Sequence, residues 1–169
     1  MKKIFFLLLT LFIVGGCNAN GQSAEDEFNE YNNEDRIALF EKSEKISDMG
    51  AKLIEKYSEP KKAQTYVDDE ILPLLKDVKS QAENVNQKLE TNEVQELHQL
   101  FLDQVTTLTD MFELQSDMLE LQVPPVSEED QQKTEELYPE LQQLSNEVDE
   151  IGQNYSEKRK ELEEKYESS

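Results

Sequence analysis

The regular spacing of apolar side chains constrains the fold of this chain more than any other feature. Between residues 67 and 89 they recur at steps of 4, 3, 4, 4, 3 and 4, and between 137 and 166 at steps of 4, 3, 4, 3, 4, 7 and 4. Such spacing puts the apolar side chains on one face of a helix. With only 5 Gly in 169 residues, the chain lacks the turns that an all-β fold needs. The sequence therefore predicts an all-α fold.

Four segments with this spacing follow one another, at residues 39–57, 67–89, 94–121 and 137–166. Phe28 and Tyr31 extend the first segment backwards if the helix begins early, and Pro60 and Pro124-Pro125 separate neighbouring segments. The first three segments carry further apolar residues beside the main stripe: Phe40, Ile54, Leu72, Leu75, Leu100, Leu102 and Leu119. Because this stripe is wider than a coiled-coil seam, we expect an elongated antiparallel helical bundle of three to four long helices. After Tyr155 the stripe narrows, so the last two turns are expected to project or to pack at one edge.

Helix starts and prolines add local detail. Ser23 and Asn33 are alternative caps for the first helix, and Ser127 is the expected cap of the fourth. Proline in a helix interior removes a hydrogen bond and clashes with the preceding turn. Pro73 falls in a first turn if Asp68 or Asp69 caps a restarted helix, whereas Pro139 is expected to kink the fourth helix.

The first residues have the pattern of a secretory signal peptide. Lys2 and Lys3 precede an apolar run over residues 4–14, and Gly15-Gly16 follows it. The run of 11 residues is far shorter than the roughly 20 that span a bilayer. We therefore expect a cleaved targeting signal rather than a transmembrane helix.

Val14-Gly15-Gly16-Cys17 resembles the lipobox of bacterial lipoproteins, with Val14 in place of the usual Leu. The resemblance implies cleavage after Gly16 and attachment of diacylglycerol to Cys17, the only cysteine, so that lipid holds the protein on the extracytoplasmic face of the cell membrane. The implied organisation is a signal peptide over 1–16, a lipidated cysteine and tether over 17–24 that extends to 33 if the helix starts late, and a helical domain over 25–169. An unmodified cysteine beside an ordinary cleavage site is the alternative.

Charge limits the partners of the chain. It has 17 Lys+Arg against 38 Asp+Glu, a formal net charge of −21, which becomes −23 once Lys2 and Lys3 are removed. Nucleic acid is excluded because its phosphates would be repelled. An anionic membrane surface would repel the domain as well, so anchoring depends on the lipid.

Candidate catalytic and metal-binding residues are few. Di-iron bundles need a Glu-x-x-His pair on two helices, and His98 is the only histidine. We expect His98 to be a partly exposed helix residue, and the acidic runs 68–70 and 128–130 to be solvated helix ends. No catalytic residue, cofactor or metal is therefore predicted, and the chain is not expected to be an enzyme.

The functional expectation is a non-enzymatic lipoprotein that presents a helical surface to a protein partner or a cell-wall polymer. In architecture alone it resembles helical cell-wall-binding lipoproteins of Gram-positive bacteria, and no specific family is assigned. The alternative is a small-ligand-binding lipoprotein with a pocket between helices, which Phe101, Met111 and Phe112 would line. A filled core with an exposed apolar groove would favour the partner instead.

Overall fold

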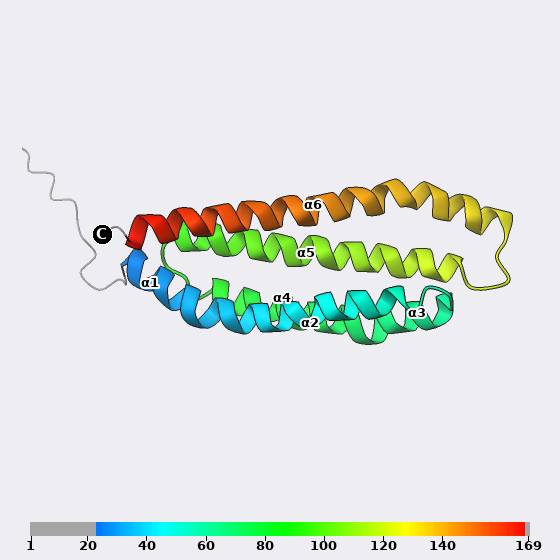
Figure 1. The fold of residues 1–169 in the computed structure, drawn as a ribbon, viewed down its shortest axis with the longest axis horizontal. Helices are drawn as coiled ribbons and strands as arrows, with labels where there is room; N and C mark the ends of the chain where they lie inside the picture. Colours follow the sequence, from blue (N-terminus) through cyan, green and yellow to red (C-terminus); the bar gives the residue numbers. More distant parts are fainter. Residues whose placement is uncertain (1–22, 168–169) are drawn as a thin grey trace, which may run out of the picture.

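The computed structural model describes residues 23–167, which form a bundle of four long antiparallel helices (Figure 1). The first consists of α1 (Ala24–Glu30), a single π-helical turn η1 (Tyr31–Asp35) and α2 (Arg36–Ile54). The second consists of α3 (Pro60–Tyr66), a second π-helical turn η2 (Val67–Ile71) and α4 (Leu72–Asn86). The third is α5 (Asn92–Leu121) and the fourth is α6 (Glu128–Glu167). The described part of the chain contains no strand, and the predicted all-α bundle is confirmed.

The helices alternate in direction along the bundle. The start of α1 and the end of α6 lie at one end, and the turns after α2 and α5 lie at the other (Figure 1). α5 packs against both α4 and α6, and α2 packs against α4. α6 reaches the first long helix through aromatic contacts, with ring centroids 5.6 Å apart for Phe28 and Tyr166 and 5.7 Å apart for Phe40 and Tyr155. The bundle is therefore closed by aromatic side chains at the end where α1 begins.

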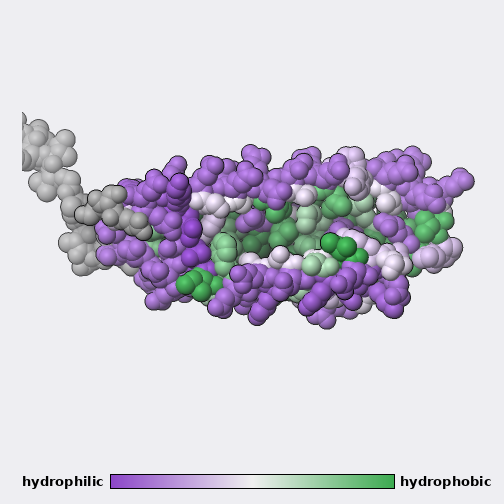
Figure 2. All heavy atoms as spheres, viewed as in Figure 1, coloured by the Kyte–Doolittle hydropathy of each residue, from purple (hydrophilic) through white to green (hydrophobic). Residues whose placement is uncertain are grey.

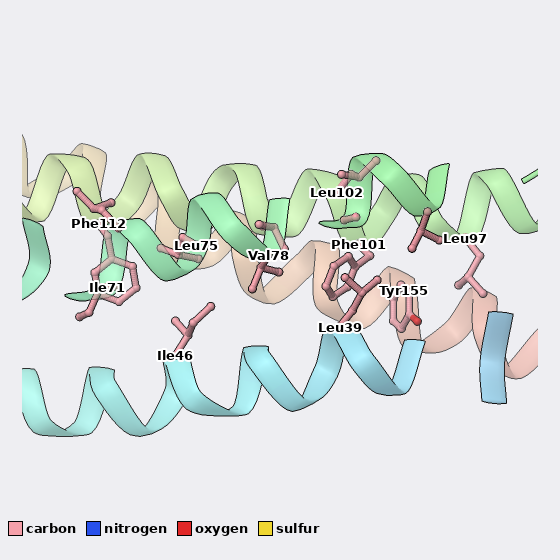
Figure 3. Packing of buried hydrophobic residues seen from close by; sticks show 14 of the residues in the cluster. Leu39, Ile46, Ile71, Leu75, Val78, Leu97, Phe101, Leu102, Phe112 and Tyr155 are labelled. Carbon is pink, nitrogen blue, oxygen red and sulfur yellow. The ribbon is translucent and has the colours of Figure 1, made fainter. Parts of the chain in front are cut away.

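The core follows the predicted apolar stripes. Side chains from all four long helices meet along the bundle axis, as Figure 3 shows for Leu39 and Ile46 of α2, Val78 of α4, Phe101 of α5 and Tyr155 of α6. Each of these five side chains is at most 4% exposed. Burial of such side chains contributes roughly 1.5–3 kcal/mol each, and it is the main source of stability for helices of this kind.

Side-chain caps fix several helix ends. The Ser23 hydroxyl accepts the N–H of Asp26 at 3.1 Å, so the earlier of the two predicted starts is the observed one. Ser127 accepts the N–H of Asp130 at 3.1 Å, and the Asp130 carboxylate accepts the N–H of Ser127 at 3.0 Å. This reciprocal arrangement satisfies two backbone donors and confirms the predicted cap of the fourth helix.

The turn before α5 is held by a buried carboxylate. Glu27 of α1 is 5% exposed. Its oxygens accept the N–H of Glu90 at 2.5 Å and the N–H of Thr91 at 2.9 Å, and also the Thr91 hydroxyl. Thr91, the N-cap of α5, makes no side-chain capping bond. The hydrogen bonds at this turn come instead from Glu27 on another helix.

The two internal prolines are accommodated in different ways. Leu72, directly before Pro73, donates its N–H to the carbonyl of Val67 in the π-helical turn η2, and the helix continues without a restart. Neither predicted cap is used, and Asp68 instead accepts the hydroxyl of Ser116 on α5 at 2.6 Å. Pro139 lies within α6, which changes direction in its first half (Figure 1).

Burial along α6 is uneven. Leu162, near the C-terminal end, is 4% exposed, and Tyr166 packs on Phe28, so the last turns pack against α1 and α5 rather than projecting. Towards the other end, the apolar residues of the heptad seam are only half buried: Leu137, Leu141, Leu144, Val148 and Ile151. The helix that packs most extensively on α6 is α5.

Candidate functional site

The predicted lipidation site, Cys17, lies outside the described residues, together with the predicted signal peptide and cleavage site. Within residues 23–167 no helix is both long enough and apolar enough to cross a bilayer. No group of three or more His, Cys, Asp or Glu side chains in the same range is placed to hold a metal ion. Two other features of the bundle are candidates for function.

The first is a buried polar network around His98. Partial exposure of this residue was expected, and that prediction is wrong because His98 is 0% exposed. Its Nε2 lies 2.7 Å from the carbonyl oxygen of Ala82 on α4, and its Nδ1 lies 3.2 Å from the hydroxyl of Tyr31. The Tyr31 hydroxyl lies 3.3 Å from that of Tyr155 on α6. All four long helices therefore meet in one chain of hydrogen bonds.

The direction of these hydrogen bonds follows from the carbonyl, which can only accept. Nε2 therefore carries the proton that it donates to Ala82, and neutral His98 must accept at Nδ1 from Tyr31. Tyr31 has then used its only proton, so Tyr155 donates to it. Burial lowers the pKa of His98 below its usual value, an effect only partly offset by the hydrogen bond to Ala82 and the Asp35 carboxylate. Burial also raises the pKa of both tyrosines.

This network has no opening to solvent, since Tyr31 is 1% and Tyr155 4% exposed. The network lies inside the core, where it links side chains and backbone of the four long helices. Sequence spacing alone missed this network, because its partners are 16, 67 and 124 residues apart in the chain and meet only in the folded bundle.

The second feature is an apolar groove between α2 and α6, with α5 as its floor. In Figure 2 hydrophobic surface is visible along the hollow between two rows of hydrophilic side chains. At the end away from the chain termini the groove deepens into a pocket of about 420 Å³. The pocket is lined by Tyr57, Gln115, Met118, Leu119, Gln122, Thr134, Tyr138 and Leu141. We call this feature, from Ser43 to Tyr57 on one side and from Tyr138 to Gly152 on the other, the α2–α6 groove.

Small residues share each wall of the α2–α6 groove with a tyrosine and add little side-chain volume to it. Ser43, Gly50 and Tyr57 recur every seven residues on one wall, and Tyr138, Ser145 and Gly152 recur every seven on the other. Residues seven apart share a helix face, and Tyr57 and Tyr138 are both placed in the pocket. A Cβ added at Gly50 would meet nothing within 4 Å, whereas one at Gly152 would lie 2.6 Å from the Gln104 amide nitrogen. Gly152 thus allows a close approach to α5, and Gly50 borders open space.

The pocket contains an unused hydrogen-bond acceptor. Gln115 donates its amide nitrogen to the Tyr57 hydroxyl at 2.5 Å. The other amide atom, Oε1, is buried and has no hydrogen-bond partner among the described residues. A buried acceptor left unpaired costs about 1–3 kcal/mol, and Oε1 is too deeply buried for a group in the pocket to reach it without movement of the Gln115 side chain.

Charge is divided unevenly between the helices. Residues 92–157, which hold α5 and most of α6, carry 17 acidic side chains against one Lys, a net charge of −16. Residues 36–86 carry 10 acidic and 9 basic side chains, a net charge of −1. The α5–α6 side of the groove is therefore strongly negative, and the α2 side is close to neutral.

The predicted solvated acids are mostly exposed, as expected for helix ends: 68, 69, 70, 128 and 129. The basic run 158–160 pairs with acids of two helices. Arg159 and Lys160 pair with Glu163 and Glu164 of the same helix, while Lys158 reaches Glu96 of α5 at 2.8 Å. These are exposed ion pairs, which typically contribute at most about 1 kcal/mol each.

Comparison with known proteins gives no functional assignment, because no family model, no curated protein and no solved structure matches the chain.

Proposed function

We propose that this protein is a non-enzymatic lipoprotein, held by lipid on Cys17 at the extracytoplasmic face of a bacterial cell membrane, that binds a protein partner through its helical surface. The observation that carries the proposal is the α2–α6 groove. Monomeric proteins rarely leave a contiguous apolar face uncovered, and such faces commonly mark interaction sites.

The position of the groove suits an anchored receptor. Cys17 precedes the N-cap Ser23 by six residues, so an anchor there would hold the α1 end within roughly 20 Å of the bilayer. The pocket at Tyr57 and Tyr138 lies at the opposite end, and the 30 residues of α5 span about 45 Å between the two. A partner would therefore meet the groove away from the lipid surface.

The small-ligand alternative is less well supported. Phe101 is 2% and Phe112 6% exposed, and both belong to the packed core together with Met111 at its edge. They line no pocket described in this bundle. The pocket beside Gln115 favours a ligand to the extent that its volume of about 420 Å³ is within the usual range for small molecules.

Anchoring is tested by metabolic labelling with a fatty acid. Label should enter the wild-type chain and be lost from Cys17→Ala, while the amounts of the two proteins are compared by immunoblot. Equal labelling of both would refute lipidation at this residue.

Partner binding is tested by photo-crosslinking in intact Gram-positive cells. A photoreactive amino acid is placed at Ser145 in the groove or, as a matched control, at Ser80 on α4. Both serines are exposed, so neither replacement disturbs the core. A protein adduct specific to position 145 supports the proposal, and equal or absent adducts at the two positions refute it.

A further inference from the structure

The α2–α6 groove has the dimensions of a helix-binding site. The wall from Ser43 to Tyr57 covers fourteen residue steps, and so does the wall from Tyr138 to Gly152. At 1.5 Å per residue the wall on α6 is about 21 Å long, the length of a helix of about 14 residues. The small side chains at positions 43, 50 and 145 leave room for another backbone to approach, whereas the space beside Gly152 is filled by Gln104.

The exposed seam of α6 supplies the apolar contacts that such a helix needs. Leu141, Leu144 and Val148 follow one another at steps of three and four, and all are half buried although they continue the same seam as the buried Tyr155 and Leu162. A seam with this repeat is completed by a second helix packed along it. At the mouth of the groove, Ile54 is 66%, Tyr57 40% and Tyr138 54% exposed, and exposed aromatic residues often dominate binding energy.

Charge selects among the possible occupants. With a net charge of −16 on residues 92–157, the α5–α6 side repels a second copy of itself, an anionic wall polymer and an anionic membrane. A cationic partner is attracted. The groove therefore has an apolar floor, the length of a short helix and a negative charge, and a cationic amphipathic helix matches all three.

We propose that the α2–α6 groove binds an amphipathic helix of a partner protein, with apolar side chains on one face and Lys or Arg on the other. This inference rests on the proposed function and specifies the chemistry of the partner. The bound helix lies along α6, buries Leu141, Leu144 and Val148, and places its cations against the carboxylates of α5 and α6.

The test uses a fluorescent peptide of about three Leu/Lys heptads and a matched peptide in which Glu replaces every Lys. The full chain is held in nanodiscs of zwitterionic lipid, with empty nanodiscs as the blank, so that lipid charge does not attract the peptide. Binding is followed by fluorescence anisotropy, and helix formation by circular dichroism. The Lys peptide should bind and gain helicity, its affinity should fall as salt screens the charges, and the Glu peptide should not bind.

Two variants locate the binding. Gly50→Leu fills the groove without a clash, since a Cβ there meets open space, and should weaken binding by about tenfold or more. Tyr138→Ser removes an exposed aromatic side chain without touching the core, and should weaken binding by about threefold or more. Ser80→Leu adds the same apolar group on α4 and should leave the affinity unchanged.

The outcomes separate this inference from the proposed function. No binding, equal binding of both peptides, or binding unchanged by Gly50→Leu and Tyr138→Ser would overturn the cationic-helix proposal. If the crosslink at Ser145 still captures a protein in that case, the proposed function stands and the partner has another chemistry. If the crosslink fails as well, both are refuted.

Discussion

Replacing His98 should remove a pH dependence of stability that is expected of the wild-type protein below about pH 6.5. Burial lowers the pKa of His98 in the folded state, while in the unfolded chain its pKa stays near the ordinary value of about 6.5. Below pH 6.5 the unfolded state therefore binds a proton that the folded state does not. The contribution of neutral His98 to the free energy of unfolding is fully present above the pKa of the unfolded state. It is lost as the pH falls towards the lower pKa of the folded state.

The magnitude follows from one proton. If His98 stays neutral in the folded protein, stability falls by up to about 1.4 kcal/mol for each pH unit below 6.5. The network supports this behaviour, because Nε2 already donates to Ala82 and Nδ1 already accepts from Tyr31. A second proton on the ring has to reverse the Tyr31 hydroxyl inside a core that is closed to water.

The assay is urea unfolding of the wild type and of His98→Gln between about pH 7.5 and pH 5.5, where no other side chain of ordinary pKa titrates. His98 is the only histidine, so the chain offers no competing imidazole. The glutamine amide can still donate to Ala82 but does not titrate. The wild type should lose about 1.4 kcal/mol more than the variant across this range. Parallel pH profiles for the two proteins would refute the argument that burial keeps His98 neutral.

Three further substitutions test the packing. Glu27→Gln should lower the free energy of unfolding by about 1–3 kcal/mol and speed hydrogen exchange at the amides of residues 90–91, because the charged acceptor of those buried bonds is lost; unchanged exchange would show that the turn holds itself. Gly50→Ala should raise stability by about 0.5–1 kcal/mol in urea unfolding, since the added methyl meets open space within a helix, and a decrease would mean that the space is occupied. Ser127→Ala should cost about 1 kcal/mol through loss of the bond from the Asp130 N–H, and a midpoint identical to that of the wild type would assign no stabilising role to this cap.

The architecture was predictable from local features because helices depend on spacing and breakers that lie within a few residues of one another. The fourth apolar segment, over residues 137–166, lies within α6 (Glu128–Glu167), and the predicted cap Ser127 precedes this helix. The all-α class and the antiparallel order followed from the apolar stripes and the short connections between them.

Burial of individual polar residues was not predictable in the same way. His98 sits at the edge of its helix stripe, which suggested partial exposure. Its burial depends on Tyr31, 67 residues away, and on the Ala82 carbonyl, 16 residues away. Glu27 likewise looks like one more acid of a first turn, and only the approach of residues 90–91 makes it a buried acceptor.

The sequence by itself determined the helices, their breakers, the predicted lipid signal and the excess of acid, because each of these depends on neighbouring residues or on composition. The tertiary structure decided which apolar stripes are covered. α6 has one continuous seam in sequence, yet contacts bury it at Tyr155 and Leu162 and leave Leu141, Leu144 and Val148 half exposed. The reason is that the spacing of residues in a helix fixes which side chains share a face. Whether another helix covers that face depends on where the neighbouring helices lie, and here α2 packs against α4.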